Sequence, residues 1–155
     1  MNRLFERFIL VQLLRAQRQS NDRQIQIEGQ ASKAFWATKT IRPDIIIRDR
    51  VNLAKPGFIL DTKWKIPVSD QPSDEDLKQM YAYNLHFGAP HSLLLYPRAD
   101  SAQVDKQNAY SRSVSLPDYT HGCGTHFIEL FNSNQLLRTD IGIQLLAHIN
   151  DQWTT

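Results

Sequence analysis

A chain of 155 residues that is 41% hydrophobic and 22% charged has the composition of a globular protein, which excludes the disordered and collagen-like classes. Its length suits one domain with a single buried core. The net charge of +2 permits a nucleic-acid-binding surface without requiring one. The single cysteine, Cys123, excludes an intramolecular disulfide and favours a reducing compartment.

Residues 2–19 are predicted as the first helix, because apolar side chains recur there at helical spacing. The apolar stretch from Phe8 to Leu14 is flanked by charged residues and is too short to span a bilayer. We therefore expect neither a secretory signal nor a membrane segment, and a cytoplasmic protein.

Two apolar segments, 45–47 and 58–66, are predicted as neighbouring strands because they are rich in β-branched and aliphatic side chains. Pro56 and Gly57 mark the turn between them. The preceding segments are a short predicted strand at 24–28 and an ambiguous stretch at 31–40.

The second half of the chain is predicted to contain two helices and two strands. Ser73 begins a helix with an acid-rich capping pattern, and Gly88 ends it. The order of elements predicts an α/β fold, with a mixed β-sheet flanked by helices, in a single domain over residues 1–155. The remaining elements are strands at 92–96 and 125–131, an exposed loop over 100–118 and a last helix at 140–153.

Two acidic residues lie at apolar strand segments, where charge is normally excluded. Asp44 precedes an isoleucine run, and Asp61 follows a phenylalanine, an isoleucine and a leucine. A buried carboxylate must be paired, hydrogen-bonded or bound to a metal. Because strand side chains alternate between faces, Asp61 and Lys63 are expected on one face. An ion pair on a solvated sheet face is the alternative.

These residues predict a magnesium site suited to phosphodiester hydrolysis. Mg²⁺ prefers oxygen ligands, here Asp44, Asp61 and the backbone carbonyl of Thr62, and Mn²⁺ is a possible substitute. The ion would polarise a phosphoryl oxygen and lower the pKa of a coordinated water. Lys63 would then orient the water or stabilise the charge of the transition state.

Gln79 and Tyr83 are four residues apart on the predicted helix after these strands, so they share one helix face. An amide and a phenol there can position a phosphate or a water, and the tyrosine ring can stack on a base. The alternative is a helix that packs Met80, Tyr83 and Phe87 into the core and leaves Gln79 in solvent.

Basic residues give a candidate face for DNA phosphates, with a solvated helix surface as the alternative. The predicted DNA-binding residues are Arg3, Arg7, Arg42 and Lys65, and the first helix and its exit also carry Arg15, Arg18 and Arg23.

His121, Cys123 and His126 offer three ligands for zinc, whereas a closed structural site needs four. A turn at Gly122 and Gly124 that leads into a strand is the alternative, and the role of the three residues stays open.

Asp44, Asp61-x-Lys63 and Gln79-x-x-x-Tyr83, in this order after a helix that bears Glu6, resemble the PD-(D/E)xK nuclease superfamily. More narrowly, five segments between residues 1 and 97 resemble the catalytic domain of the McrC family. The segments are Met1-Asn2-Arg3-Leu4-Phe5-Glu6, Arg42-Pro43-Asp44, Leu60-Asp61-Thr62-Lys63-Trp64-Lys65, Gln79-Met80-Tyr81-Ala82-Tyr83 and Leu94-Leu95-Tyr96-Pro97.

This resemblance implies a restriction-endonuclease-like core and a Mg²⁺-dependent DNA endonuclease of a system that cuts near 5-methylcytosine. It implies that Asp44 and Asp61 bind the metal, that Lys63 is the catalytic lysine, and that Gln79 and Tyr83 complete the active site. Glu6 would be a further active-site acid and a possible metal ligand, whereas the helical pattern alone favours a surface position.

The resemblance also implies a partner, a GTP-driven AAA+ protein of the McrB type. Members of the family carry a docking region ahead of the nuclease domain, and we expect this chain to lack it. A homodimer is a further possibility for the assembly. The alternatives are a non-catalytic DNA-binding or interaction remnant of the same fold, and a stand-alone nuclease of DNA repair or phage defence.

Overall fold

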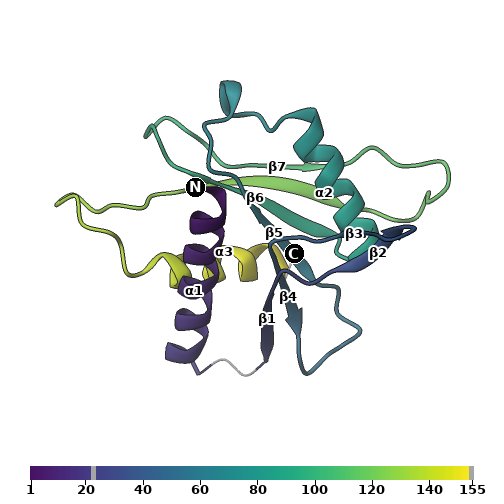
Figure 1. The fold of residues 1–155 in the computed structure, drawn as a ribbon, viewed down its shortest axis with the longest axis horizontal. Coiled ribbons are helices and arrows are strands. Elements are labelled where there is room, and N and C mark those ends of the chain that lie inside the picture. Colours follow the sequence, from purple (N-terminus) through teal and green to yellow (C-terminus); the bar gives the residue numbers. More distant parts are fainter. Residues whose placement is uncertain (22–23, 154–155) are drawn as a thin grey trace.

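The structure, a computed structural model, describes residues 1–21 and 24–153. A sheet of six strands lies between helices on its two faces (Figure 1). The elements are α1 (Asn2–Gln19), β1 (Ile25–Gly29), β2 (Lys33–Trp36), β3 (Lys39–Ile41), β4 (Ile45–Asp49), β5 (Phe58–Thr62), the 3₁₀ turn η1 (Val68–Asp70), α2 (Asp74–Phe87), β6 (His91–Pro97), β7 (Lys106–Ala109), β8 (Gly122–Ile128) and α3 (Ile141–Trp153).

The sheet is mixed, as the sequence predicts. Its strand order is β1-β4-β5-β6-β8-β7, and β2 and β3 form a separate hairpin. The pairs β1–β4, β4–β5 and β7–β8 are antiparallel, whereas β5–β6 and β6–β8 are parallel. The prediction that the two acid-bearing segments are neighbours is confirmed, because β4 and β5 pair directly.

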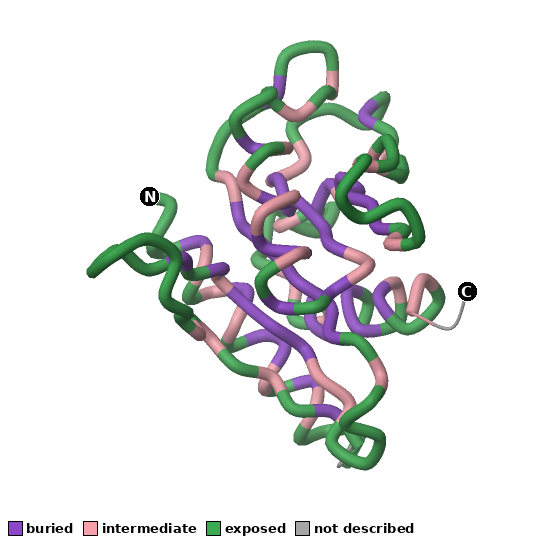
Figure 2. Tube along the Cα trace, turned by 90° about the vertical axis from the view of Figure 1, so that its right-hand side faces the viewer, coloured by how far each residue is buried: buried purple, intermediate pink, exposed green. Residues whose placement is uncertain are grey.

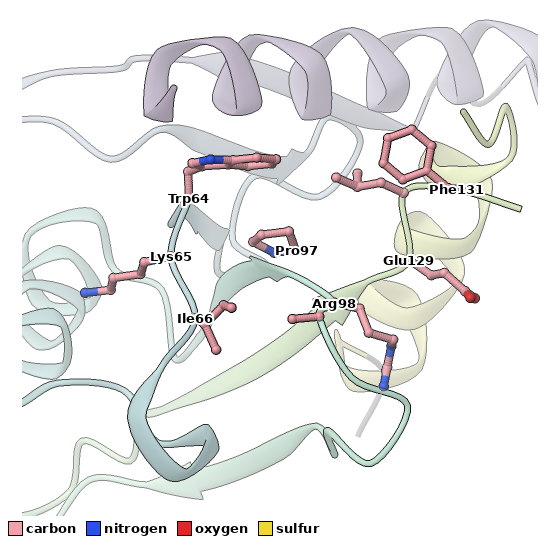
Figure 3. A pocket seen from close by; sticks show the side chains of 9 residues that line it. Trp64, Lys65, Ile66, Pro97, Arg98, Glu129 and Phe131 are labelled. Carbon is pink, nitrogen blue, oxygen red and sulfur yellow. The ribbon is translucent and has the colours of Figure 1, made fainter. Parts of the chain in front are cut away.

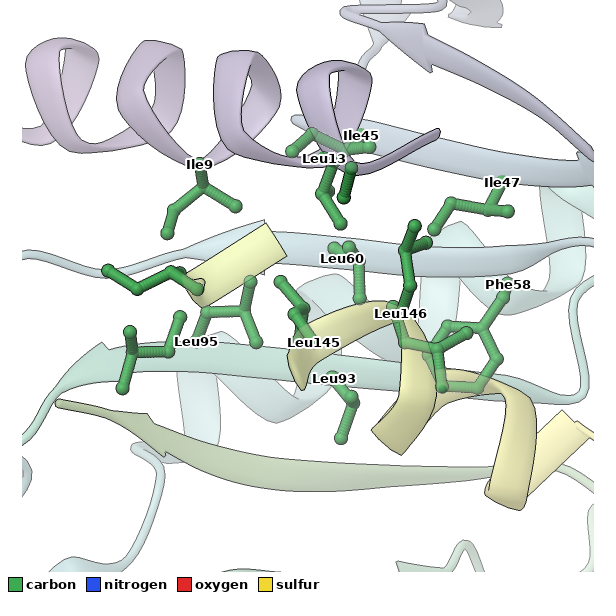
Figure 4. Packing of buried hydrophobic residues seen from close by; sticks show 14 of the residues in the cluster. Ile9, Leu13, Ile45, Ile47, Phe58, Leu60, Leu93, Leu95, Leu145 and Leu146 are labelled. Atoms are coloured by element: carbon green, nitrogen blue, oxygen red, sulfur yellow. The ribbon is translucent and has the colours of Figure 1, made fainter. Parts of the chain in front are cut away.

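Two apolar layers hold the helices on the sheet. Helices α1 and α3 cover one face, where Ile9, Leu13 and Leu145 point toward Leu60 and Leu95 of the strands (Figure 4). Helix α2 covers the other face with a second buried cluster. Buried residues therefore run along the central strands between the helices, while the loops are exposed (Figure 2).

Three predictions of the boundaries need correction, and one ambiguous segment is resolved. Strand β5 ends at Thr62 and not at 66, because the backbone turns there, with the Lys65 N–H donating to the Lys63 carbonyl at 2.9 Å. The ambiguous segment 31–40 holds the β2–β3 hairpin. The predicted loop 100–118 contains β7, and the predicted strand 125–131 begins earlier, at Gly122. Among the described residues, no helix is long and apolar enough to cross a membrane.

Candidate active site

The candidate site lies where β4 begins and β5 ends, on the face of the sheet that α2 covers. Asp61 pairs in register with Leu94 of β6, which belongs to the apolar cluster under α2. Asp44 directly precedes β4, and because β4 and β5 are antiparallel, the start of β4 lies beside the end of β5. Asp44 and Asp61, which are 17 residues apart in the sequence, therefore lie close together in the structure.

Asp44 is fixed by the residue that follows Asp61. Its Oδ2 accepts hydrogen bonds from the Thr62 backbone N–H at 2.7 Å and from the Thr62 hydroxyl at 2.8 Å. These bonds hold the Asp44 carboxylate against the end of β5. They orient it without a charged partner at that oxygen, so its negative charge acts on the neighbouring Asp61.

Asp61 is a buried carboxylate, with 3% of its surface exposed, which excludes the alternative of a solvated ion pair. Burial, together with the negative charge of Asp44, raises the pKa of Asp61 to about 6. Lys63 opposes this effect with its Nζ at 2.6 Å from Asp61 Oδ2. The site thus holds more negative charge than its own lysine compensates, as a cation-binding site does.

Lys63 is held between two acids, one of which the sequence analysis did not assign to the site. Its Nζ lies 3.3 Å from Asp76 Oδ1, and Lys65 Nζ lies 2.6 Å from Asp76 Oδ2. Burial lowers the pKa of Lys63, but the charges of Asp61 and Asp76 outweigh burial and raise it above its usual value. The Lys63 side chain is therefore an ammonium that donates hydrogen bonds.

Asp76 could have been found from spacing. It is three residues before Gln79 and seven before Tyr83, so the three side chains share one stripe of α2. In the sequence, Asp76 is explained by the helix-capping pattern, and the Ser73 hydroxyl does accept from the Asp76 N–H at 3.1 Å. The contact of its side chain with Lys63 was therefore not predicted.

Gln79 and Tyr83 extend the contacts of Lys63 along α2. Gln79 Oε1 accepts from Lys63 Nζ at 2.9 Å, and Gln79 Nε2 donates to the Tyr83 hydroxyl at 2.7 Å. The hydroxyl donates in turn to the Arg42 carbonyl at 3.0 Å, next to the Pro43-Asp44 pair. Burial and the charge of Asp61 raise the pKa of Tyr83 to about 12, so the phenol keeps its proton.

The alternative for α2 was a helix that packs three residues in the core and leaves Gln79 in solvent. It is correct for the three core residues and wrong for Gln79. Met80, Tyr83 and Phe87 do pack in the core. Gln79, however, is half-buried and bonded to Lys63 rather than left in solvent.

The raised pKa of Asp61 gives a first prediction, for protein in a metal chelator. Because the folded state favours the protonated carboxyl, the stabilisation is complete below pH 3.8 and is lost as pH rises through about 6. From pH 4 to pH 7 wild-type protein should lose about 2 kcal/mol relative to Asp61→Asn, whose side chain does not titrate. Urea denaturation of both proteins from pH 4 to pH 7 measures the difference. A difference that stays constant across this range would contradict the prediction.

Metal binding by Asp44, Asp61, Glu6 and the Thr62 carbonyl stays a prediction, but the structure shows where Glu6 lies. Glu6 is half-buried, and its Oε1 accepts from Gln30 Nε2 at 2.7 Å, while the Gln30 N–H donates to the Asp44 carbonyl at 2.8 Å. Among the described residues, Glu6, Asp44 and Asp61 do not form a group whose ligand atoms all lie within 4.8 Å of one another. Glu6 therefore reaches Asp44 through Gln30, and the Thr62 carbonyl stays a prediction.

The predicted DNA-binding residues differ in their surroundings. Arg3, Arg7 and Arg42 are exposed, whereas the Lys65 ammonium is paired with Asp76. Arg15 and Arg18 are also exposed on α1, and Arg23 lies outside the described residues.

A cavity of about 470 Å³ opens at the segment that follows Lys63 (Figure 3). None of Asp44, Asp61 and Lys63 lines it. Trp64 and Lys65, the residues that follow Lys63, line one side, and Arg98 and Phe131 line the other. The Trp64 ring makes an edge-on contact with Phe5, at 5.3 Å between centroids, and the Trp64 backbone N–H donates to Asn2 Oδ1 at 2.8 Å. The cavity thus combines aromatic and cationic side chains next to the candidate site.

The structure separates the three residues of the predicted zinc set. Cys123 is buried under α2, and His121 lies 3.2 Å from Asn84 of that helix, between the Nδ1 and Nδ2 atoms. His126 belongs to the opposite face, because it pairs in register with Leu95, which packs under α1 and α3. The alternation of strand side chains therefore prevents His126 from joining the other two.

Comparison with known proteins bears on the family and on the fold. A family model described as McrBC 5-methylcytosine restriction system component matches residues 1–97. A chain in a solved assembly, described as McrB AAA+ hexamers with bound McrC from Thermococcus gammatolerans, is similar with a TM-score of 0.66 at 18% identity. The similarity covers 96% of this chain and 33% of the other, so this chain spans about a third of its length. No curated protein sequence matches.

Proposed function

The chain belongs to the family of McrBC 5-methylcytosine restriction system components, and from this premise we propose that it is the Mg²⁺-dependent DNA endonuclease of such a system. The observation that carries the proposal is the buried Asp61. It is paired with Lys63, and it lies close enough to Asp44 for the charge of Asp44 to raise its pKa. A domain kept only for interaction has no need of such a costly arrangement.

The donor atoms at the site suit Mg²⁺. Asp44 and Asp61 supply carboxylate oxygens, Thr62 adds a backbone carbonyl, and Glu6 is a possible further ligand. When bound, the ion would neutralise charge on the scissile phosphate and supply a hydroxide-like nucleophile at neutral pH. Asp44 and Asp61 contribute here by placing a half-buried and a buried carboxylate next to each other, where a cation would compensate their charges.

Lys63 then acts as a fixed positive charge. Its ammonium donates toward the attacking water or the phosphate oxygens, where negative charge grows in the transition state. Asp76 and Gln79 hold it in place, and Tyr83 fixes the Gln79 amide, so that Gln79 and Tyr83 are positioning residues. In the structure the three N–H groups of Lys63 face Asp61, Asp76 and Gln79. The N–H that faces Asp61 would become available to the reaction when the ion takes up the Asp61 carboxylate.

The substrate would approach along the cavity at the segment that follows Lys63. The rings of Trp64 and Phe131 offer surfaces on which a base can stack, and Arg98 offers charge for the phosphates. Lys65 would add its charge by exchanging Asp76, its partner at 2.6 Å, for a phosphate. Arg3, Arg7 and Arg42 would extend this positive surface. A nuclease of DNA would be expected in the cytoplasm.

The partner in the proposal is an AAA+ protein of the McrB type, since the solved neighbour comes from an assembly of McrB AAA+ hexamers with bound McrC. That partner would recognise the modified base and couple cleavage to nucleotide hydrolysis. The proposal places no docking surface on the residues described here.

Metal binding tests the proposal directly. We expect calorimetric titration with Mg²⁺, or with Mn²⁺, to show binding to wild-type protein and a loss of at least about 100-fold in affinity in Asp61→Asn, which removes one of few charged ligands. Asp49→Asn, at the far end of β4, is the matched control and should bind as wild type does. Absence of binding in wild type would favour a non-catalytic remnant of the fold.

A further inference from the structure

A second cluster of potential ligands lies on the sheet face opposite Asp61. Asp105 precedes β7, His126 belongs to β8 and His148 belongs to α3. One ligand atom from each residue lies within 4.8 Å of those of the other two, and all three residues are half-buried. These residues come from three elements that are far apart in the sequence, so the fold itself assembles the cluster.

Hydrogen bonds fix the three side chains in place. Asp105 Oδ2 lies 2.5 Å from His126 Nδ1, and Asp105 Oδ1 accepts from the Phe127 N–H at 2.9 Å. The rings of His126 and His148 stack with 4.2 Å between centroids. The two rings are thus close enough to share one cation, and since their lone pairs lie in nearly parallel ring planes, one ring would turn about its side-chain bonds for both to face the ion.

A fourth residue, Gln152, supports the cluster from the next turn of α3. Its Nε2 lies 3.0 Å from His148 Nε2, while its own Oε1 is buried without a hydrogen-bond partner. Exchanging the two amide atoms, which have nearly the same shape, would let Oε1 accept from a protonated His148 Nε2. A histidine that donates one ring N–H to an oxygen presents its other nitrogen to a metal.

We propose that Asp105, His126 and His148 form a binding site for Zn²⁺. Two imidazole nitrogens and one carboxylate oxygen are ligands that zinc takes in proteins, with water in the fourth position, whereas Mg²⁺ prefers oxygen ligands alone. The ion would tie α3 and the edge strand β7 to β8. The site lies across the sheet from Asp61 and needs none of the residues proposed for cleavage.

Calorimetric titration with ZnCl₂, in a buffer with excess Mg²⁺, tests the site. Wild-type protein should bind one Zn²⁺ per chain, and its Tm should rise with the ion. His148→Gln should lower the affinity at least about 100-fold and abolish the rise in Tm, while Gln152→Ala should cost about 10-fold. His86→Gln, which changes an exposed histidine of α2, should bind as wild type does.

Three results would overturn the proposal: no zinc binding by wild type, equal affinity in His148→Gln, or zinc binding that Asp61→Asn abolishes and His148→Gln keeps. Far-UV circular dichroism reports whether each variant is folded. Should His148→Gln fail to fold, Asp105→Asn is judged by the same criterion, because it keeps the shape of the side chain while removing its charge.

Discussion

Replacing Lys63 with alanine is expected to lower the rate of DNA cleavage by about 10³-fold, because the substitution removes the positive charge at the reacting phosphate. Fold and metal binding should survive. Asp61 would lose its partner at 2.6 Å, but a bound cation would compensate its charge. Cleavage of DNA that contains 5-methylcytosine, measured with Mg²⁺ and an McrB-type partner with GTP, gives the rate.

Lys55→Ala is the matched control for this experiment. It removes the same charge at the opposite end of β5, where Lys55 Nζ lies 3.9 Å from Asp49 Oδ2 and 4.3 Å from the centre of the Trp153 ring. This variant should cleave at close to the wild-type rate. Equal cleavage by wild type and Lys63→Ala would show that the proposed mechanism is wrong, even if metal binding is intact.

The parts of the site that could be predicted from the sequence are those where a residue contradicts its surroundings. Asp44 and Asp61 stand out because apolar strand segments normally exclude charge, and the pairing of β4 with β5 brings them together. Asp76 was missed because it satisfies a local rule, that of the helix cap, and therefore looks complete without a second role.

Contacts between elements that are distant in the sequence cannot be predicted from local sequence patterns. The residues Asp105, His126 and His148 have no common spacing, and only the packing of α3 and β7 on β8 joins them. The three potential zinc ligands at short spacing, His121, Cys123 and His126, do not come together, for the related reason that strand neighbours alternate between faces. Strand β7 was hidden as well, because its residues are polar and exposed at the edge of the sheet.

Replacing Gly142 with alanine is expected to destabilise the protein by about 3 kcal/mol, although alanine favours a helix over glycine by about 1 kcal/mol. Helices α1 and α3 touch at this point. A Cβ atom at Gly142 would collide with the backbone carbonyl of Gln12 and press on Ala16, and a backbone carbonyl cannot rotate away. Thermal denaturation should show a Tm about 10 °C lower for a chain of this size.

Ile143→Ala is the control, because Ile143 is 52% exposed on the next position of α3 and should change stability by at most about 0.5 kcal/mol. Gly142→Ala should also displace residues near the candidate site. The substitution pushes α1 away from α3, and α1 carries both Glu6 and the Asn2 side chain that holds the Trp64 N–H beside Lys63. A stable Gly142→Ala protein with unchanged Tm would mean that α1 is free to shift on the sheet, and that its acid is then not held in place for metal binding.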